Sequence, residues 1–187
     1  LVLSAAGCAR GVAADSAHPS ILLVSLDTFR ADRLGAFGHS RGLTPNLDAF
    51  AAESVVFEHA YAQANITSMS HGSVFTSRYP SELGAPGPTF RLDATTPTLA
   101  GVLKLYGYAT AAFTAGGHLA PGWGLERGFD TFTASPPMGS FWHTIPPALQ
   151  WLDAHAAATP FFLLVHSYDA HAPYLDPAPY GLAWVDP

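Results

Sequence analysis

Two apolar runs stand out along the chain, and polar side chains follow each of them. Ile21 to Leu26 is followed by Asp27, and Phe161 to Val165 is followed by His166. Such runs are typical of parallel strands that helices cover on both faces. Ligands of open α/β sheets gather at the carboxyl ends of the strands. The pattern therefore predicts two central strands whose ends present Asp27 and His166 for chemistry.

The segments between these runs alternate between helical and extended patterns. Residues 44–53 begin with a Thr cap and a Pro at the first helical position, which predicts a short amphipathic helix. Residues 116–139 are rich in Gly and Pro, which predicts irregular chain. Further helices are expected over residues 96–105 and 146–157, and further strands over residues 55–57 and 108–113.

One short cluster of hydroxyls contains an imidazole and precedes a helix-compatible run. Residues 67–71 read Thr-Ser-Met-Ser-His, and the pattern places Thr67 at the start of a helix. A helix N-terminus attracts anions through its unpaired N–H groups and its dipole. An ordinary N-cap formed by Thr67 is the alternative interpretation.

Composition narrows the class of protein. The 187 residues are 49% hydrophobic and 12% charged, which predicts one globular domain with a sizeable core. The net charge of -6, with only eight Lys and Arg, argues against a nucleic-acid surface but is compatible with a small anionic substrate. The single cysteine, Cys8, excludes a disulfide within the chain and a cysteine-built metal site.

The first ten residues resemble the cleavage region of a bacterial lipoprotein, with Cys8 as the lipidated residue. Residues 1–19 are therefore expected to be a signal remnant and linker, and residues 20–187 the folded domain. The expected location is the bacterial cell envelope or periplasm, with membrane contact only through a lipid anchor. An Ala-rich terminus with an idle cysteine is the alternative.

Several polar groups are expected at one edge of the predicted sheet. Asp27 and His166 follow strands, Asp169 and His171 follow shortly after His166, and Thr67 begins a helix. A carboxylate, a hydroxyl and imidazoles are the components of a metal-assisted site for anion transfer.

Other polar residues carry no such assignment. Arg30 and Asp32 are expected to form a structural ion pair in the turn after the first strand. Six histidines lie outside any motif and are expected to be surface or satisfied polar residues: His18, His39, His59, His118, His143 and His155.

Six motifs in order resemble the sulfatase family of the alkaline-phosphatase superfamily over about residues 20–187. They are Leu23-Val24-Ser25-Leu26-Asp27-Thr28-Phe29-Arg30-Ala31-Asp32, Thr44-Pro45-Asn46-Leu47-Asp48, Thr67-Ser68-Met69-Ser70-His71, Thr76-Ser77-Arg78-Tyr79-Pro80, Gly124-Leu125-Glu126-Arg127-Gly128-Phe129-Asp130 and His166-Ser167-Tyr168-Asp169-Ala170-His171-Ala172-Pro173-Tyr174.

The resemblance implies an α/β/α sandwich with a mainly parallel central sheet, truncated at its C-terminus. It implies hydrolysis or transfer of sulfate or phosphate esters with a divalent metal ion (Ca, Mn, Mg or Zn). Asp27 matches the metal-binding carboxylate and Thr67 the nucleophile, which also binds the metal. His171 matches an imidazole near the oxyanion or leaving group. His71 is a further catalytic candidate, and His166 and Asp169 are substrate-binding candidates.

The sequence departs from the family pattern at the nucleophile. Sulfatases carry Cys or Ser within Cys-x-Pro-x-Arg and convert it to formylglycine, whereas this chain has Thr67, Met69 and His71 there. No formylglycine is therefore expected. Thr28 also replaces a second metal-binding Asp. A Thr nucleophile resembles the phosphodiesterase and phosphoglycerol-transferase branches, in which a metal-activated hydroxyl attacks phosphorus.

The later metal ligands of the family, an Asp followed by His or Asn, have no counterpart in this sequence. The chain is therefore expected to be the N-terminal part of a longer enzyme, and inactive alone. Two other classes stay open, a catalytically degenerate domain that binds anions and a lipid-anchored structural domain in which Thr67 would be exchangeable.

Overall fold

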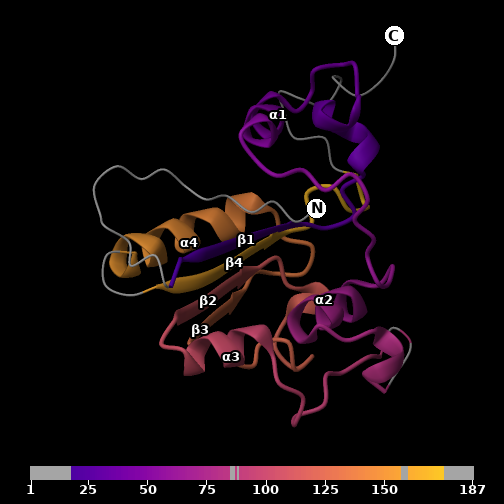
Figure 1. Ribbon diagram of the computed structural model, residues 1–187. Coiled ribbons are helices and arrows are strands. Elements are labelled where there is room, and N and C mark those ends of the chain that lie inside the picture. Colours follow the sequence, from indigo (N-terminus) through magenta and orange to yellow (C-terminus); the bar gives the residue numbers. More distant parts are fainter. Residues whose placement is uncertain (1–17, 85–86, 88, 157–159, 175–187) are drawn as a thin grey trace.

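The computed structural model describes residues 18–84, 87, 89–156 and 160–174 (Figure 1). Its centre is a four-stranded sheet in the order β1-β4-β2-β3, and every neighbouring pair is parallel. The strands are β1 (Ile21–Leu26), β2 (Ala109–Thr114), β3 (Thr131–Ala134) and β4 (Phe161–Ser167). The two apolar runs are adjacent parallel strands, with Val24 opposite Val165. Of the two strands expected to be central, β4 is, whereas β1 lies at the edge of the described sheet and is partly exposed.

Helices cover both faces of this sheet, which makes the α/β/α sandwich (Figure 1). On one face, α4 (Phe141–His155) packs Ala148 and Trp151 against Leu163 and Val165 of β4. On the other face, α2 (Thr67–Thr76) packs Met69 and Phe75 near Leu164, and α3 (Leu99–Leu105) lies beside it. Successive residues of β4 alternate between the two faces, so one strand supplies both cores.

The helix α1 (Pro45–Ala52) lies apart from both faces of the sheet (Figure 1). It packs against η2 (Gly35–Phe37), and the carboxylate of Asp48 accepts hydrogen bonds from the Ala36 amide and the Thr44 hydroxyl. The remaining short helices are η1 (Ala31–Arg33), η3 (Pro80–Glu82) and η4 (Gly117–Leu119). The predicted Arg30–Asp32 ion pair is confirmed at 2.6 Å on an exposed turn.

Three sequence-based expectations about secondary structure were wrong: the start of α4, the strand over residues 55–57, and the irregular segment that contains β3. The helix expected from residue 146 begins at Phe141, because the Ser140 amide donates to His143 Nδ1 and closes a first turn ahead of the prolines. Residues 55–57 form no strand, and Val55 and Phe57 are more than half exposed. Local pattern alone favoured extended structure there.

The strand β3 lies within the segment that was expected to be irregular. Its start is joined to β2 by Asp130, whose amide donates to Thr110 O and whose carboxylate accepts from the Thr110 hydroxyl at 3.0 Å. Four residues are too few to give a clear alternation, so pairing with β2 rather than local pattern makes this strand.

In the part of the chain that the structure describes, no helix is long and apolar enough to cross a membrane. Cys8 and most of the expected linker over residues 1–19 lie outside the described residues.

Candidate active site

Thr67 is the first residue of α2, and its hydroxyl points to the end of β1 rather than to its own helix. Ile66 is the N-cap and forms no side-chain cap, while Thr67 Oγ1 donates to Asp27 Oδ2 at 2.9 Å. The interpretation of Thr67 as an ordinary capping residue is therefore wrong. The hydroxyl lies beside the free N–H groups of the first helical turn, where an anion is stabilised.

Asp27 lies immediately after β1 and is almost fully buried. The amide of Ala115 donates to His166 Nδ1, so Nε2 carries the proton and donates to Asp27 Oδ2 at 3.4 Å. Burial alone would raise the pKa of Asp27. Hydrogen bonds from His166 and Thr67 outweigh burial, with the pKa held below its ordinary value. The carboxylate is thus a stable negative charge at the sheet edge.

His71 lies one turn after Thr67 on α2 and is buried against β1. Its Nδ1–H donates to the Thr67 carbonyl at 2.9 Å, since that oxygen can only accept, and the Ser25 hydroxyl donates to Nε2 at 3.0 Å. Burial first, then the neighbouring His166, lowers the pKa of His71 to about 4. The imidazole is therefore neutral at neutral pH, and it ties the start of α2 to β1.

His171 lies in the loop after β4, beside Tyr168 rather than beside Asp27. Its ring stands edge-on to the Tyr168 ring at 5.4 Å, and Nδ1–H donates to the Ala172 carbonyl at 2.6 Å. Among the described residues, no hydrogen bond joins His171 to Asp27 or Thr67. The loop is held near the site because the Thr28 hydroxyl donates to the Ala170 carbonyl at 2.9 Å.

The carboxylate of Asp169 faces the start of α4. It accepts from the Phe141 amide at 2.9 Å and from the Ser167 hydroxyl, so it joins the end of β4 to α4. The structure thus brings four of the sequence-predicted residues into one hydrogen-bonded group, which contains Asp27, Thr67, His71 and His166, and leaves Asp169 and His171 at its border.

Two residues near this group were not singled out from the sequence. Tyr168 is buried, with its ring edge-on to His166 at 4.6 Å, and burial raises the pKa of its hydroxyl. His118 follows β2, shares a 3.2 Å hydrogen bond with Ser68 and stacks on Trp123. The sequence contained one indication for His118. This histidine comes shortly after the strand predicted over residues 108–113, at the sheet edge that also carries Asp27 and His166.

A pocket of about 480 Å³ opens at this group. Asp27, Thr67 and His71 line it, together with the carboxyl end of β1 and residues 60–62 and 64–66. This volume lies within the ~300–1,000 Å³ range of small-molecule sites. The pocket therefore offers a hydroxyl, a carboxylate and a helix N-terminus to one small anionic ligand.

The donors present suit a hard divalent cation but are few. Within the described residues, no group of three or more His, Cys, Asp and Glu side chains could hold a metal ion. Asp27 and Thr67 supply two oxygen donors 2.9 Å apart. Oxygen ligands are those that Ca²⁺ and Mg²⁺ prefer, although such ions take about six or more.

Comparison with known proteins identifies relatives. A family model described as Sulfatase matches residues 19–182. Arylsulfatase A of Bos taurus is 38% identical over 108 residues, which cover 54% of this chain and 21% of that protein. N-acetylgalactosamine-6-O-sulfatase of Bacteroides thetaiotaomicron is 32% identical over 113 residues, which cover 56% of this chain and 22% of that protein. The chain spans about a fifth of the length of these curated relatives.

Solved structures share the fold. One, described as a complex with its substrate D-glucosamine-2-N,6-O-disulfate, gives a TM-score of 0.76 at 19% identity and covers 85% of this chain and 36% of that chain. A phosphonate monoester hydrolase of Agrobacterium radiobacter gives a TM-score of 0.70 at 22% identity, with 89% and 44% covered. A protein of the alkaline phosphatase superfamily from Vibrio parahaemolyticus gives 0.63 at 22% identity, with 86% and 43% covered.

Proposed function

The chain belongs to the sulfatase family, and from this premise we propose that the complete protein is a metal-dependent hydrolase of sulfuric or phosphoric esters with Thr67 as its nucleophile. The observation that carries the proposal is the 2.9 Å hydrogen bond from Thr67 Oγ1 to Asp27 Oδ2 at the N-terminus of α2. Residues 20–187 would form the N-terminal part of the catalytic domain.

The geometry supports a division of roles within the site. The Thr67 hydroxyl loses its proton to water, and its oxygen attacks sulfur or phosphorus and forms a covalent ester as the alcohol leaves. Water then displaces that ester and restores the hydroxyl. The bond to Asp27 orients the hydroxyl, and the N–H groups of the first turn of α2 stabilise the negative charge gained. Asp27 and Thr67 would hold a divalent cation, which when bound lowers the pKa of the attacking hydroxyl.

The histidines divide into supporting and border residues. His166 donates to Asp27 and His71 holds the Thr67 backbone, so both position the reacting groups. His171 lies at the border of the site beside Tyr168, and we assign to it protonation of the departing alcohol.

Phosphoryl transfer is the second candidate, as in phosphodiesterases or phosphoglycerol-type transferases. The residue that favours it is Thr67 itself, which is neither Cys nor Ser and so gives no formylglycine. The bond formed by the hydroxyl would then be to phosphorus, with the same orientation by Asp27.

We propose esters of sugars as the substrate class, because relatives of this chain are named for sulfate on N-acetylgalactosamine.

We also propose that the protein resides in the bacterial cell envelope, anchored through a lipid on Cys8. Mass spectrometry of the protein made in a bacterium from its complete gene should find a diacylglyceryl group on Cys8, and a free thiol would refute the anchor.

The nucleophile is tested by replacing Thr67 in the complete protein. Thr67→Ala should lower kcat by about 10³-fold or more on aryl sulfate and aryl phosphate diester substrates, because no other group supplies the hydroxyl. Thr67→Ser should retain far more activity. Thr76→Ala is the matched control in the same helix, since its hydroxyl donates to the Gly72 carbonyl one turn earlier. Near-parental turnover by Thr67→Ala on every substrate the parent accepts would exclude the assignment.

A further inference from the structure

Tyr168 directly follows β4 and is buried beside two histidines of the candidate active site. Its ring stands edge-on to the His166 ring at 4.6 Å and to the His171 ring at 5.4 Å. Its amide donates to the Gly139 carbonyl at 3.1 Å, and its carbonyl accepts from the His171 amide at 2.8 Å. The ring is therefore fixed at the carboxyl edge of the sheet.

The phenol hydroxyl of Tyr168 lies against the loop that follows β2. A Cβ added to Gly117, at φ +60°, would lie 3.1 Å from Tyr168 Oη, so this glycine leaves room for the hydroxyl. Burial raises the pKa of the phenol, while hydrogen bonds with the Thr67 side chain and the His118 backbone act in the opposite direction. The pKa stays above its ordinary value near 10, so the phenol keeps its proton at neutral pH.

The proton of Thr67 decides which of the two hydroxyls is the donor. A hydroxyl has one proton and two lone pairs. Thr67 Oγ1 gives its proton to Asp27 Oδ2 at 2.9 Å, so toward Tyr168 it can only accept. The Tyr168 hydroxyl therefore donates to the oxygen that we propose as the nucleophile.

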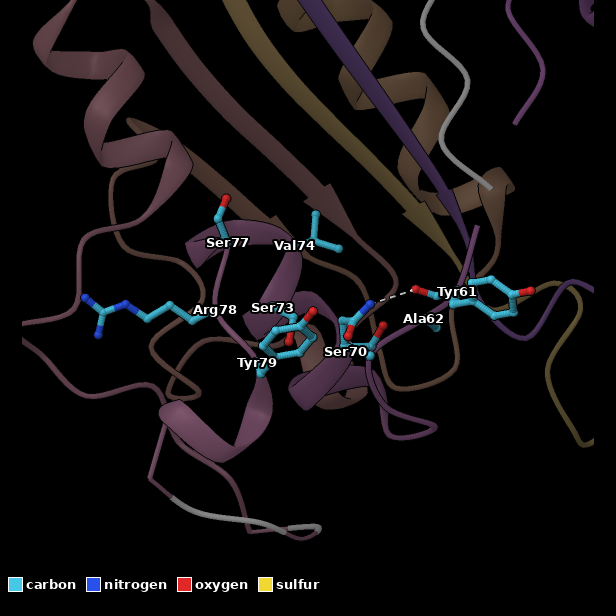
Figure 2. Close-up of a pocket in the computed structure, with 9 residues that line it drawn as sticks. Tyr61, Ala62, Ser70, Ser73, Val74, Ser77, Arg78 and Tyr79 are labelled. Carbon is cyan, nitrogen blue, oxygen red and sulfur yellow. Dashed lines mark hydrogen bonds between the residues drawn. The ribbon is translucent and has the colours of Figure 1, made fainter. Parts of the chain in front are cut away.

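The serines that follow Thr67 have other surroundings. Ser68 shares a 3.2 Å hydrogen bond with His118. Ser70 and Ser77 line a second hollow of about 360 Å³ along α2 (Figure 2). In the part of the chain that the structure describes, no hydrogen bond joins these three hydroxyls to the Thr67 side chain. The donor to Thr67 thus comes from the end of β4 and not from α2 itself.

We propose that Tyr168 is a further catalytic residue, whose O–H stabilises the Thr67 oxygen whenever that oxygen is negatively charged. Charge gathers there twice in the proposed reaction, when Thr67 loses its proton before attack and when its oxygen leaves as water displaces the covalent ester. A hydrogen bond to a charged oxygen is stronger than one to a neutral oxygen. This role rests on the proposed function of Thr67, and its own basis is the buried phenol held beside His166, His171 and Gly117.

Removing only the phenol oxygen tests this role in the complete protein. Tyr168→Phe should lower kcat about 10²-fold on aryl sulfate or aryl phosphate diester substrates and leave KM unchanged, because the lost bond is strongest when the Thr67 oxygen is charged. 3-Fluorotyrosine at position 168 keeps the donor in a ring of similar shape and should restore most of the turnover. Tyr108→Phe is the matched control, since Tyr108 is also buried and its hydroxyl donates to the Pro19 carbonyl at 3.0 Å.

Thermal melting distinguishes catalysis from a structural role. Because Phe keeps the ring contacts of Tyr168, Tyr168→Phe should change Tm no more than Tyr108→Phe does. Parental kcat per folded molecule in Tyr168→Phe, with or without a lower Tm, would overturn the catalytic role.

The variant Thr67→Ala separates this inference from the proposed function. If Thr67→Ala keeps near-parental turnover, the proposed function fails. If Thr67→Ala abolishes turnover while Tyr168→Phe behaves like Tyr108→Phe, the proposed function stands and the role of Tyr168 alone is refuted.

Discussion

At the residue scale, one oxygen atom organises the candidate site. Asp27 Oδ2 accepts from Thr67 of α2 at 2.9 Å and from His166 of β4 at 3.4 Å, and Asp27 itself directly follows β1. Its surroundings keep the pKa of Asp27 low, so the carboxylate stays charged at neutral pH. This one atom thus links the end of β1 to α2 and to β4 at the site.

The buried His71 predicts a pH-dependent stability. The unfolded chain binds a proton at this residue below about pH 6.5, whereas the folded chain binds one only near pH 4. The contribution of His71 to the free energy of unfolding should therefore be constant above about pH 6.5 and fall by up to about 3 kcal/mol as the pH drops toward 4. Urea denaturation across this range measures it.

The control variants separate His71 from other titrating groups. The fall in the free energy of unfolding between about pH 6.5 and 4 should largely disappear in His71→Gln. It should persist in His59→Gln, because position 59 is exposed. An unchanged decline in His71→Gln would show that another group causes it.

At the element scale, the backbone of the turn that contains Gly128 lies so close to α3 that no side chain fits at position 128. Gly128 has φ +91°, and an added Cβ would overlap the Gly101 amide of α3. Gly128→Ala should cost several kcal/mol, because backbone rather than a flexible side chain blocks it. Gly122→Ala, at φ +98° in open space, should cost only about 1–2 kcal/mol. Equal losses of unfolding free energy in Gly128→Ala and Gly122→Ala, measured by urea denaturation, would contradict the close backbone contact between Gly128 and Gly101.

The central strand β4 should dominate stability among the elements, because it pairs with both β1 and β2. Leu164 is fully buried in the core between the sheet and α2, so Leu164→Ala should cost about 2–5 kcal/mol. Leu105 on α3 is 87% exposed, and Leu105→Ala should change the free energy of unfolding by less than about 0.5 kcal/mol. Similar losses at both positions would show that the described core is wrong.

At the scale of the whole molecule, a divalent cation should stabilise the complete protein. A cation at 100 times its Kd adds about 2.7 kcal/mol to the free energy of unfolding, so Tm should rise when Ca²⁺, Mg²⁺, Mn²⁺ or Zn²⁺ replaces a chelator. Asp27→Asn should abolish the rise because it removes a proposed ligand. Asp153→Asn, at an exposed position on α4, should keep it. A full rise in Asp27→Asn would exclude Asp27 as a ligand.

Local patterning was sufficient for much of the fold. The apolar runs that became β1 and β4 predicted parallel strands, because burial on both faces leaves a continuous apolar sequence. That reason holds for β4, which is buried, whereas β1 is partly exposed at the edge of the described sheet. The same logic placed Asp27 and His166 at one sheet edge, and the order of motifs indicated the sulfatase family. Pattern failed at β3 and at the start of α4, where pairing with β2 and the contact between Ser140 and His143 decide the structure.

The hydrogen bonds of the site required the tertiary structure. Thr67 and Asp27 are 40 positions apart, and His166 and Asp27 are 139 apart, so no local preference encodes these contacts. Whether the Thr67 hydroxyl caps its helix or faces Asp27 depends on where α2 docks against β1. The proton positions on His71 and His166 likewise follow from the Thr67 carbonyl and the Ala115 amide that packing brings to them. Sequence supplied the chemical groups, and chain packing selected their partners because hydrogen bonds form only over short, directed distances.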